Sequence, residues 1–195
     1  MRLQAHGIAT DLPAGWEGRI GLRDVPPAVP GAGAKAGPKG SPDEIPHPVV
    51  HLANFALPED RGDYGSGAVD LMTADHVLVV LVEFGPESAG TALFRRKGLP
   101  TRLTPSMFSS SALQRTLPGQ AGCQVWCTVE GRAFCCYTVL GRQSAATRVL
   151  PQANAVLAAA GAAEGQRPGD DLLVQLPGAV QPAGFRRDED DGVEV

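Results

Sequence analysis

The residues best suited to chemistry in this chain are four cysteines gathered in one short stretch: Cys123, Cys127, Cys135 and Cys136. Thiolates bind metals and carry redox reactions, but a metal site needs sulfurs that converge, as a C-x-x-C pair allows. No such pair is present. The stretch, residues 123–140, reads CQVWCTVEGRAFCCYTVL. Its two apolar runs, rich in β-branched and aromatic residues, flank Glu130-Gly131 and predict a β-hairpin.

A two-residue turn at Glu130-Gly131 would fix the register of this hairpin. It would pair Val129 with Arg132, Cys127 with Phe134, and Val125 with Cys136. Side chains alternate between the faces of a strand. One face would carry Val125, Cys127, Phe134 and Cys136, and the other Trp126, Cys135, Tyr137 and Val139. Since both faces are largely apolar, we expect a central hairpin covered on both sides. The four sulfurs do not converge, so we expect reduced, structural thiols and no metal.

Two histidines also suggest a metal site, because His47 and His51 are four residues apart. On a helix this spacing would place both imidazoles on one face. Pro46 and Pro48 argue against a helix there. On a strand the two side chains would share a face but lie about 13 Å apart, too far for one ion. We therefore predict no metal at these histidines.

Three other patterns lack the partners that their chemistry needs. Ser109–Ser111 is not part of a Gly-x-Ser-x-Gly elbow, so it predicts a loop and not a nucleophile. The glycines of residues 62–67 lack the Lys-Ser/Thr of a phosphate-binding loop. The basic cluster Arg95–Lys97 is more typical of a solvated loop than of an anion site. We predict no catalytic residue, no cofactor and no metal.

Length and composition limit the class of protein. The chain has 195 residues and a net charge of −4, with 43% hydrophobic and only 5% aromatic residues. One domain is the natural expectation for this length. The charge does not support a nucleic-acid partner. The N-terminal residues lack the apolar core of a signal peptide, and no run is long enough to span a membrane. These features predict a cytoplasmic protein.

The elements that would position the candidate residues form an α+β pattern. We expect a hairpin of residues 3–12 and 16–22 turning at Pro13–Gly15, with Trp16 in the core. Residues 47–57 and 75–84 are typical of strands. One helical turn is expected at each of residues 67–72 and 105–108. Residues 151–160 have apolar side chains at helical spacing and predict a helix that starts at Pro151 and stops at Gly161.

These elements predict a single α+β domain over residues 1–161. Its core would be an antiparallel sheet of about six strands with the late amphipathic helix packed on it. Residues 24–46 are rich in proline and glycine and have no hydrophobic period, which indicates a disordered insertion. Residues 162–195 lose the period again and end in an acidic run, which indicates a flexible tail.

The order of these elements resembles that of the PsbP/Mog1-type α/β/α sandwich. The residues that carry the resemblance are Leu12, Pro13, Gly15 and Trp16 of LPAGWEGRI, followed by a layered antiparallel sheet and a late helix. The Ala, Gly, Arg and Val bias is also similar to that of high-GC actinobacterial proteins. The resemblance implies a non-catalytic domain that binds other proteins or membrane complexes. It assigns no binding residue.

Two functional hypotheses follow from the sequence. The first is a non-catalytic cytoplasmic accessory or adaptor domain that binds a protein partner. The second is an enzyme whose site is assembled from dispersed polar residues, since a catalytic triad is defined by geometry and not by spacing. The residues available to such a site are His6, Asp11, His51, Ser66, Asp75 and His76. A pocket in which a histidine meets a carboxylate and a nucleophile would favour the enzyme.

Overall fold

The computed structural model describes residues 1–23 and 46–162. Nearly all of the predicted insertion (residues 24–45) and of the predicted tail (residues 163–195) lies outside the described residues. The described part is α+β, as expected, and its strands form a five-stranded and a three-stranded sheet. Among the described residues, no helix combines the length and apolarity needed to cross a membrane.

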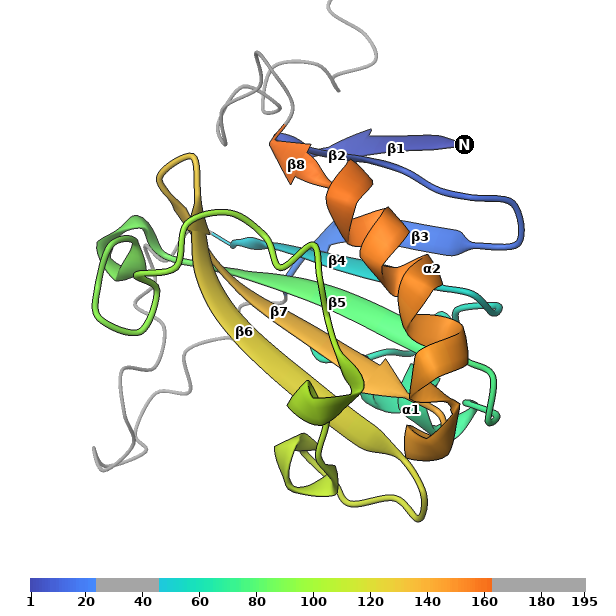
Figure 1. The fold of residues 1–195 in the computed structure, drawn as a ribbon. Coiled ribbons are helices and arrows are strands. Elements are labelled where there is room, and N and C mark those ends of the chain that lie inside the picture. The colour runs from blue at the N-terminus through green and yellow to red at the C-terminus, as the bar shows by residue number, and fades with distance from the viewer. Residues whose placement is uncertain (24–45, 163–195) are drawn as a thin grey trace, which may run out of the picture.

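The larger sheet has the strand order β3–β4–β5–β7–β6, and all of its pairings are antiparallel (Figure 1). Its strands are β3 (Glu17–Leu22), β4 (Pro48–Ala53), β5 (Val77–Phe84), β6 (Ala121–Val129) and β7 (Arg132–Leu140). β5 and β7 lie inside the sheet, and nearly all of their residues are buried. Their unbroken apolar runs are the pattern expected of strands that are covered on both faces.

The predicted hairpin and its register are confirmed. β6 and β7 pair with Val129 opposite Arg132, Cys127 opposite Phe134, and Val125 opposite Cys136. Glu130 and Gly131 both have positive φ angles, 49° and 81°, as a type I′ turn requires. Only β7 is central, however, because β6 is the edge strand of the sheet. The expectation of a central hairpin therefore holds for one of its two strands.

Each face of the larger sheet carries its own hydrophobic cluster. The helix face is covered by helix α2 (Ala146–Ala159), by the segment of residues 99–108 and by the smaller sheet (Figure 1). The loop face is covered by residues 54–72, which include helix α1 (Ser66–Asp70), and by residues 113–117. Cys127 and Cys136 face the helix side, and Cys135 and Tyr137 face the loop side, as the alternation predicted.

The predicted N-terminal hairpin is wrong. Residues 2–11 are already a complete hairpin of β1 (Arg2–Ala5) and β2 (Ile8–Asp11). Its turn is His6-Gly7, where both φ angles are positive, 49° and 68°. The turn at Pro13–Gly15 instead carries the chain from the smaller sheet to the larger one, where β3 pairs with β4. Trp16 lies in the core, as predicted, and is 7% exposed.

The predicted start of the late helix is also wrong. α2 begins at Ala146, after the 3₁₀ turn η4 (Gln143–Ala145), so that Pro151 lies inside the helix. A proline inside a helix removes one backbone hydrogen bond and costs about 3 kcal/mol. Val149 and Leu150, which precede it, are fully buried against the sheet, and burying two such side chains offsets this cost. After α2, strand β8 (Gly161–Ala162) pairs with β2.

The remaining elements agree better with the predictions made from the sequence. β4 and β5 are shorter than the predicted runs 47–57 and 75–84, but both are strands. The predicted turn at residues 105–108 is the 3₁₀ helix η2 (Pro105–Met107), and that at residues 67–72 corresponds to α1. Two further 3₁₀ helices are η1 (Pro86–Ser88) and η3 (Ser110–Ala112).

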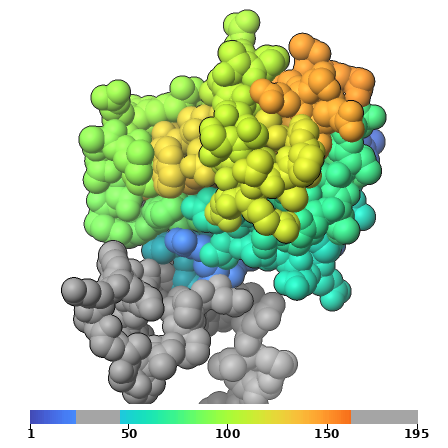
Figure 2. All heavy atoms as spheres, turned by 90° about the horizontal axis from the view of Figure 1, so that it is seen from below, coloured from blue at the N-terminus to red at the C-terminus, as the bar shows by residue number. Residues whose placement is uncertain are grey.

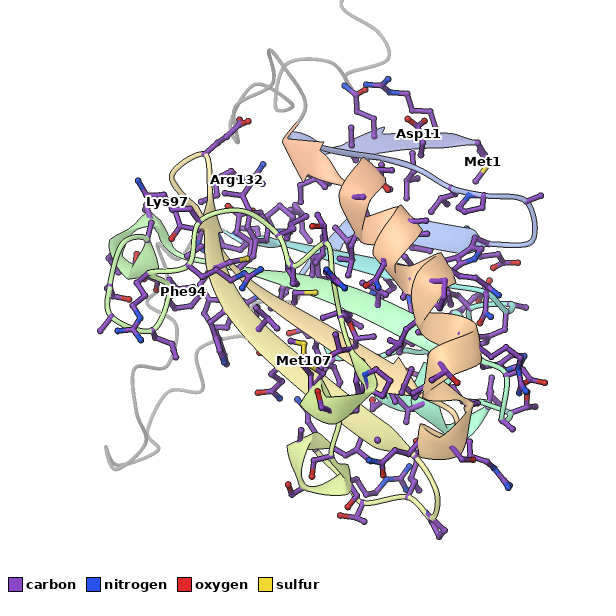
Figure 3. The ribbon with its side chains drawn as sticks, in the orientation of Figure 1. Met1, Asp11, Phe94, Lys97, Met107 and Arg132 are labelled. Atoms are coloured by element: carbon purple, nitrogen blue, oxygen red, sulfur yellow. The ribbon has the colours of Figure 1, made fainter. Side chains whose placement is uncertain are left out.

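A buried ion pair joins the two sheets. Arg132 donates to both carboxylate oxygens of Glu83, at 2.9 and 2.5 Å, across β5 and β7. The same guanidinium donates to the carbonyls of Gly7 and His6, at 2.8 and 3.0 Å. Figure 3 shows Arg132 at the end of the β6–β7 hairpin that faces the smaller sheet. Bidentate, charge-assisted bonds of this kind position the β1–β2 turn firmly.

Candidate functional site

Within the described residues, a groove on the loop face has both apolar and polar side chains in its wall. It has a volume of about 280 Å³, close to the smaller end of ligand-binding pockets. We call it the tyrosine groove; it is lined by Tyr64, Ser66, Val69, Leu113, Gln114, Arg115, Leu117 and Tyr137. A hollow of about 690 Å³ over Pro118, Gly119 and residues 142–144 is larger, but it is wide open to solvent and has few walls.

Three parts of the chain build the groove. Tyr137 comes from the middle of β7, and its ring meets that of Tyr64 edge-on at 5.8 Å. Tyr64 precedes α1, whose chain turns through Gly65 with a φ of 75°. The third part, residues 113–117, follows η3 and is held against β6 by the pairing of Ser109 with Gly122. Figure 2 shows the yellow-green segment of residues 105–118 beside the teal segment of residues 54–72.

Glycine is required where α1 packs against the loop before it. A Cβ on Gly67 would lie 2.1 Å from the carbonyl oxygen of Asp60, closer than real contacts allow. This close approach presses the first turn of α1 onto residues 60–61 and so fixes one wall of the groove.

The polar groups of the groove are suited to binding and not to proton transfer. Burial is the main cause that raises the pKa of Tyr64 and of Tyr137 above the ordinary value of 10, so both phenols stay protonated near neutral pH. Arg115 forms an ion pair with Asp70 at the exposed rim. Among the described residues that line the groove there is no Asp, Glu, His or Cys. A general acid or base needs a pKa near the working pH, and burial moves the pKa of each phenol further from neutral pH.

The six residues proposed for a dispersed enzyme site lie in four separate places. His6 lies in the β1–β2 turn and Asp11 ends β2. Asp75 and His76 precede β5, where Asp75 pairs with Arg148 and the ring of His76 stacks on Phe55 at 4.5 Å. The Nδ1 atom of His76 accepts a hydrogen bond from the backbone N–H of Thr73.

Apart from the sequence neighbours Asp75 and His76, only His51 and Ser66 among these six residues come near one another, through Gly62. The Nε2 atom of His51 lies 3.2 Å from the Gly62 carbonyl oxygen, and a Cβ added to Gly62 would lie 2.9 Å from the Ser66 hydroxyl oxygen. Burial, followed by the positive charge of Arg61, lowers the pKa of His51 to about 4. The ring is therefore neutral near pH 7, and its Nε2–H donates to the Gly62 carbonyl. Among the described residues, no carboxylate orients this histidine, so the two residues do not form a catalytic triad.

The cysteines lie on both faces of the β6–β7 hairpin and all four are buried free thiols. Burial is the main cause that raises the pKa of each thiol, to about 11 for Cys127 and about 12 for Cys135. A thiol with so high a pKa is a poor nucleophile and a poor metal ligand, because both roles need the thiolate. Within residues 1–23 and 46–162, no three His, Cys, Asp or Glu side chains lie close enough together to hold one ion.

The residues that sequence reasoning missed are Tyr64, Gln114 and Arg115. Tyr137 was assigned to the correct face by the hairpin register, but no pattern linked it to a loop 73 residues earlier in the chain. A signal was present in the scarcity of tyrosine: the chain has only two, and both line the groove.

The comparisons with known proteins give no further guide to the site. No family model, no curated protein and no solved structure matches this chain.

Proposed function

We propose that the chain is a non-catalytic accessory or adaptor domain that binds a protein partner through the tyrosine groove. The observation that carries this proposal is the groove itself, in which two phenols, an amide and a guanidinium surround an apolar floor of Val69, Leu113 and Leu117. Tyrosine and arginine are enriched where proteins bind one another, because each combines apolar contact area with hydrogen bonding.

The surroundings of the dispersed polar residues also favour binding over catalysis. The best-buried histidine, His51, uses its ring to hold the loop that carries Tyr64 and Ser66. His76 and Asp75 similarly hold the start of β5. His51 thus anchors the loop that forms one wall of the groove, and a rigid wall lowers the entropic cost of binding a partner.

The proposal includes a cytoplasmic setting and a resemblance to PsbP/Mog1-type domains. Four free thiols are compatible with a reducing compartment. The antiparallel sheet with a late helix agrees with the resemblance in the order of elements, although Pro13–Trp16 connect two sheets and do not turn a hairpin. The net charge of −4 argues against a nucleic-acid partner.

Quantitative affinity capture from the native cell tests the proposal. The full chain is used as bait in three forms: wild type, Tyr64→Ala with Arg115→Ala, and the control Arg2→Ala on β1. We expect wild type and control to recover the same partner, and the groove variant to recover at least about tenfold less of it, as the loss of hot-spot residues predicts.

Equal recovery by all three baits would place the binding surface elsewhere on the protein. If no bait enriched any protein, the adaptor proposal would be wrong. Near-ultraviolet circular dichroism of the three purified chains checks that the groove variant keeps its packed core.

A further inference from the structure

The outer edge of β6 is covered at both ends but open in the middle. At one end, Thr128 exchanges backbone hydrogen bonds with Arg96 and Gly98, at 2.7 and 2.9 Å. At the other end, Gly122 exchanges two bonds with Ser109, at 3.0 and 2.9 Å. Because backbone groups alternate in direction along a strand, Gln124 and Trp126 also point their N–H and C=O groups outward. Within the described residues, none of these four groups has a partner on the outer side.

The segment of residues 96–109 pairs with both ends of the β6 edge and moves away from the edge between them. After Gly98 the chain crosses the helix face, where Leu99, Leu103 and Phe108 join the core, and it returns at Ser109 (Figure 1). The gap therefore faces the loop side. The outward-facing residues of β6 run from Gly122 to Thr128, a span of about 20 Å. Since both ends of this span are already paired, room is left for about three residues of an added strand.

Two residues beside the gap, Trp126 and Gln124, have their side chains on the loop face. Trp126 is half-buried and packs with Phe84 and Phe94, with ring centroids 5.4 and 5.3 Å away. Gln124 is exposed and lies opposite Tyr137, which lines the tyrosine groove. Residues opposite one another on paired strands share a face. An added strand would therefore place one side chain on Trp126 and the next residue of the same face beside the groove.

The positive charge near the gap indicates which kind of segment would bind there as an added strand. Arg95, Arg96 and Lys97 are all exposed, and none forms an ion pair within residues 1–23 and 46–162. Figure 3 shows Lys97 and Phe94 together beside the end of the β6–β7 hairpin. Lys97 forms a parallel bridge with Thr128, so this basic cluster lies at the Thr128 end of the gap. Glu130 in the hairpin turn offsets part of this positive charge.

We propose that β6 binds an extended, acidic segment of a partner protein as a short additional strand. Its apolar side chains contact Trp126 and the tyrosine groove, and its acidic side chains pair with the exposed basic groups of Arg95–Lys97 at the Thr128 end of the gap. Backbone bonds to Gln124 and Trp126 supply affinity, and the alternation supplies specificity. This inference rests on the proposed function, because it names the kind of partner that the groove would take.

The test uses a fluorescein-labelled peptide of alternating valine and glutamate, VEVEVEV, added to the full chain and followed by fluorescence anisotropy. We expect saturable binding that weakens at least about tenfold in Gln124→Pro, which removes an outward N–H without breaking a bond to β7. The matched variant Gln124→Ala keeps that N–H and should bind like wild type. Arg95→Glu with Lys97→Glu should also lose at least about tenfold, whereas the distant reversal Arg2→Glu should not.

Three results would overturn the inference. The first is equal binding of the lysine peptide VKVKVKV, and the second is equal binding by Gln124→Pro and Gln124→Ala. The third is sedimentation showing a wild-type dimer that Gln124→Pro dissociates, since the occupant would then be a second copy of the chain. If the peptide fails to bind while affinity capture still depends on Tyr64 and Arg115, the inference that β6 binds an added strand is wrong, and the proposed function stands.

Discussion

Acidification should destabilise this protein through one buried histidine. His51 is 2% exposed and lies in β4 beneath the loop that carries Tyr64. Burial and the nearby charge of Arg61 lower its pKa from 6.5 to about 4. In the unfolded chain the imidazole regains its ordinary pKa. The unfolded state therefore binds a proton at a higher pH than the folded state does.

The direction and size of the effect follow from proton linkage. Above pH 6.5 His51 is neutral in both states and its full contribution to stability is present. As the pH falls from 6.5 towards 4, the unfolded state gains the proton first and the free energy of unfolding decreases. At about 1.4 kcal/mol for each pKa unit, the loss reaches about 2 kcal/mol at pH 5 and about 3 kcal/mol at pH 4.

Urea unfolding followed by the fluorescence of Trp16 and Trp126 measures this loss. The comparison is between wild type and His51→Gln, whose amide can donate to the Gly62 carbonyl but does not titrate. Between pH 7.5 and pH 5, wild type should lose about 2 kcal/mol more than the variant. His76→Gln is the matched control: burial also lowers the pKa of His76, but its ring is only half-buried, so this variant should reduce the acid loss less than His51→Gln does. Parallel stability curves for wild type and His51→Gln would refute the reasoning.

Three further predictions concern the core and the scaffold. All four thiols should react slowly with Ellman's reagent in the native protein and fully in urea, because burial raises their pKa values; fast native labelling or stoichiometric zinc would contradict this. Arg132→Met should lower the free energy of unfolding by about 3–5 kcal/mol by leaving Glu83 buried and unpaired, and Glu83→Leu added to it should recover part of the loss in the same urea assay. Gly67→Ala should lower the thermal midpoint, since its Cβ would clash with the Asp60 carbonyl, whereas Gly21→Ala meets nothing within 4 Å and should leave the midpoint nearly unchanged.

The β6–β7 hairpin was predictable because its information is local. A two-residue turn, the alternation of faces and two apolar runs specify its register without any distant contact. The same is true of β5, whose run of buried residues admits no alternative. The prediction was wrong where two local patterns competed for the same turn. Pro13–Gly15 has the residue types of a hairpin turn, but the N-terminal hairpin turns at His6-Gly7, where both φ angles are positive as a type I′ turn requires. Pro151 indicated a helix start, but tertiary burial of Val149 and Leu150 outweighs its cost.

The candidate site was far less predictable, because it depends on contacts between distant residues. Tyr64 and Tyr137 meet only after two antiparallel pairings, β4 with β5 and β5 with β7, have brought the loop before α1 over β7. The open edge of β6 depends on where residues 96–98 and Ser109 pair. Local sequence patterns encode neither contact. In the described residues the four cysteines are buried in the sheet, and His51 and His76 form hydrogen bonds to loop backbone.

Photo-crosslinking from the groove tests the central claim most directly. Arg115, whose side chain is 64% exposed at the groove rim, is replaced by benzoylphenylalanine in the full chain expressed in its native cells, and Arg2 on β1 is replaced in a matched control. We predict one discrete protein adduct at position 115 that position 2 does not form, and that is lost when Tyr64→Ala is added. The same adducts from both positions, or none from position 115, would contradict a protein-binding groove.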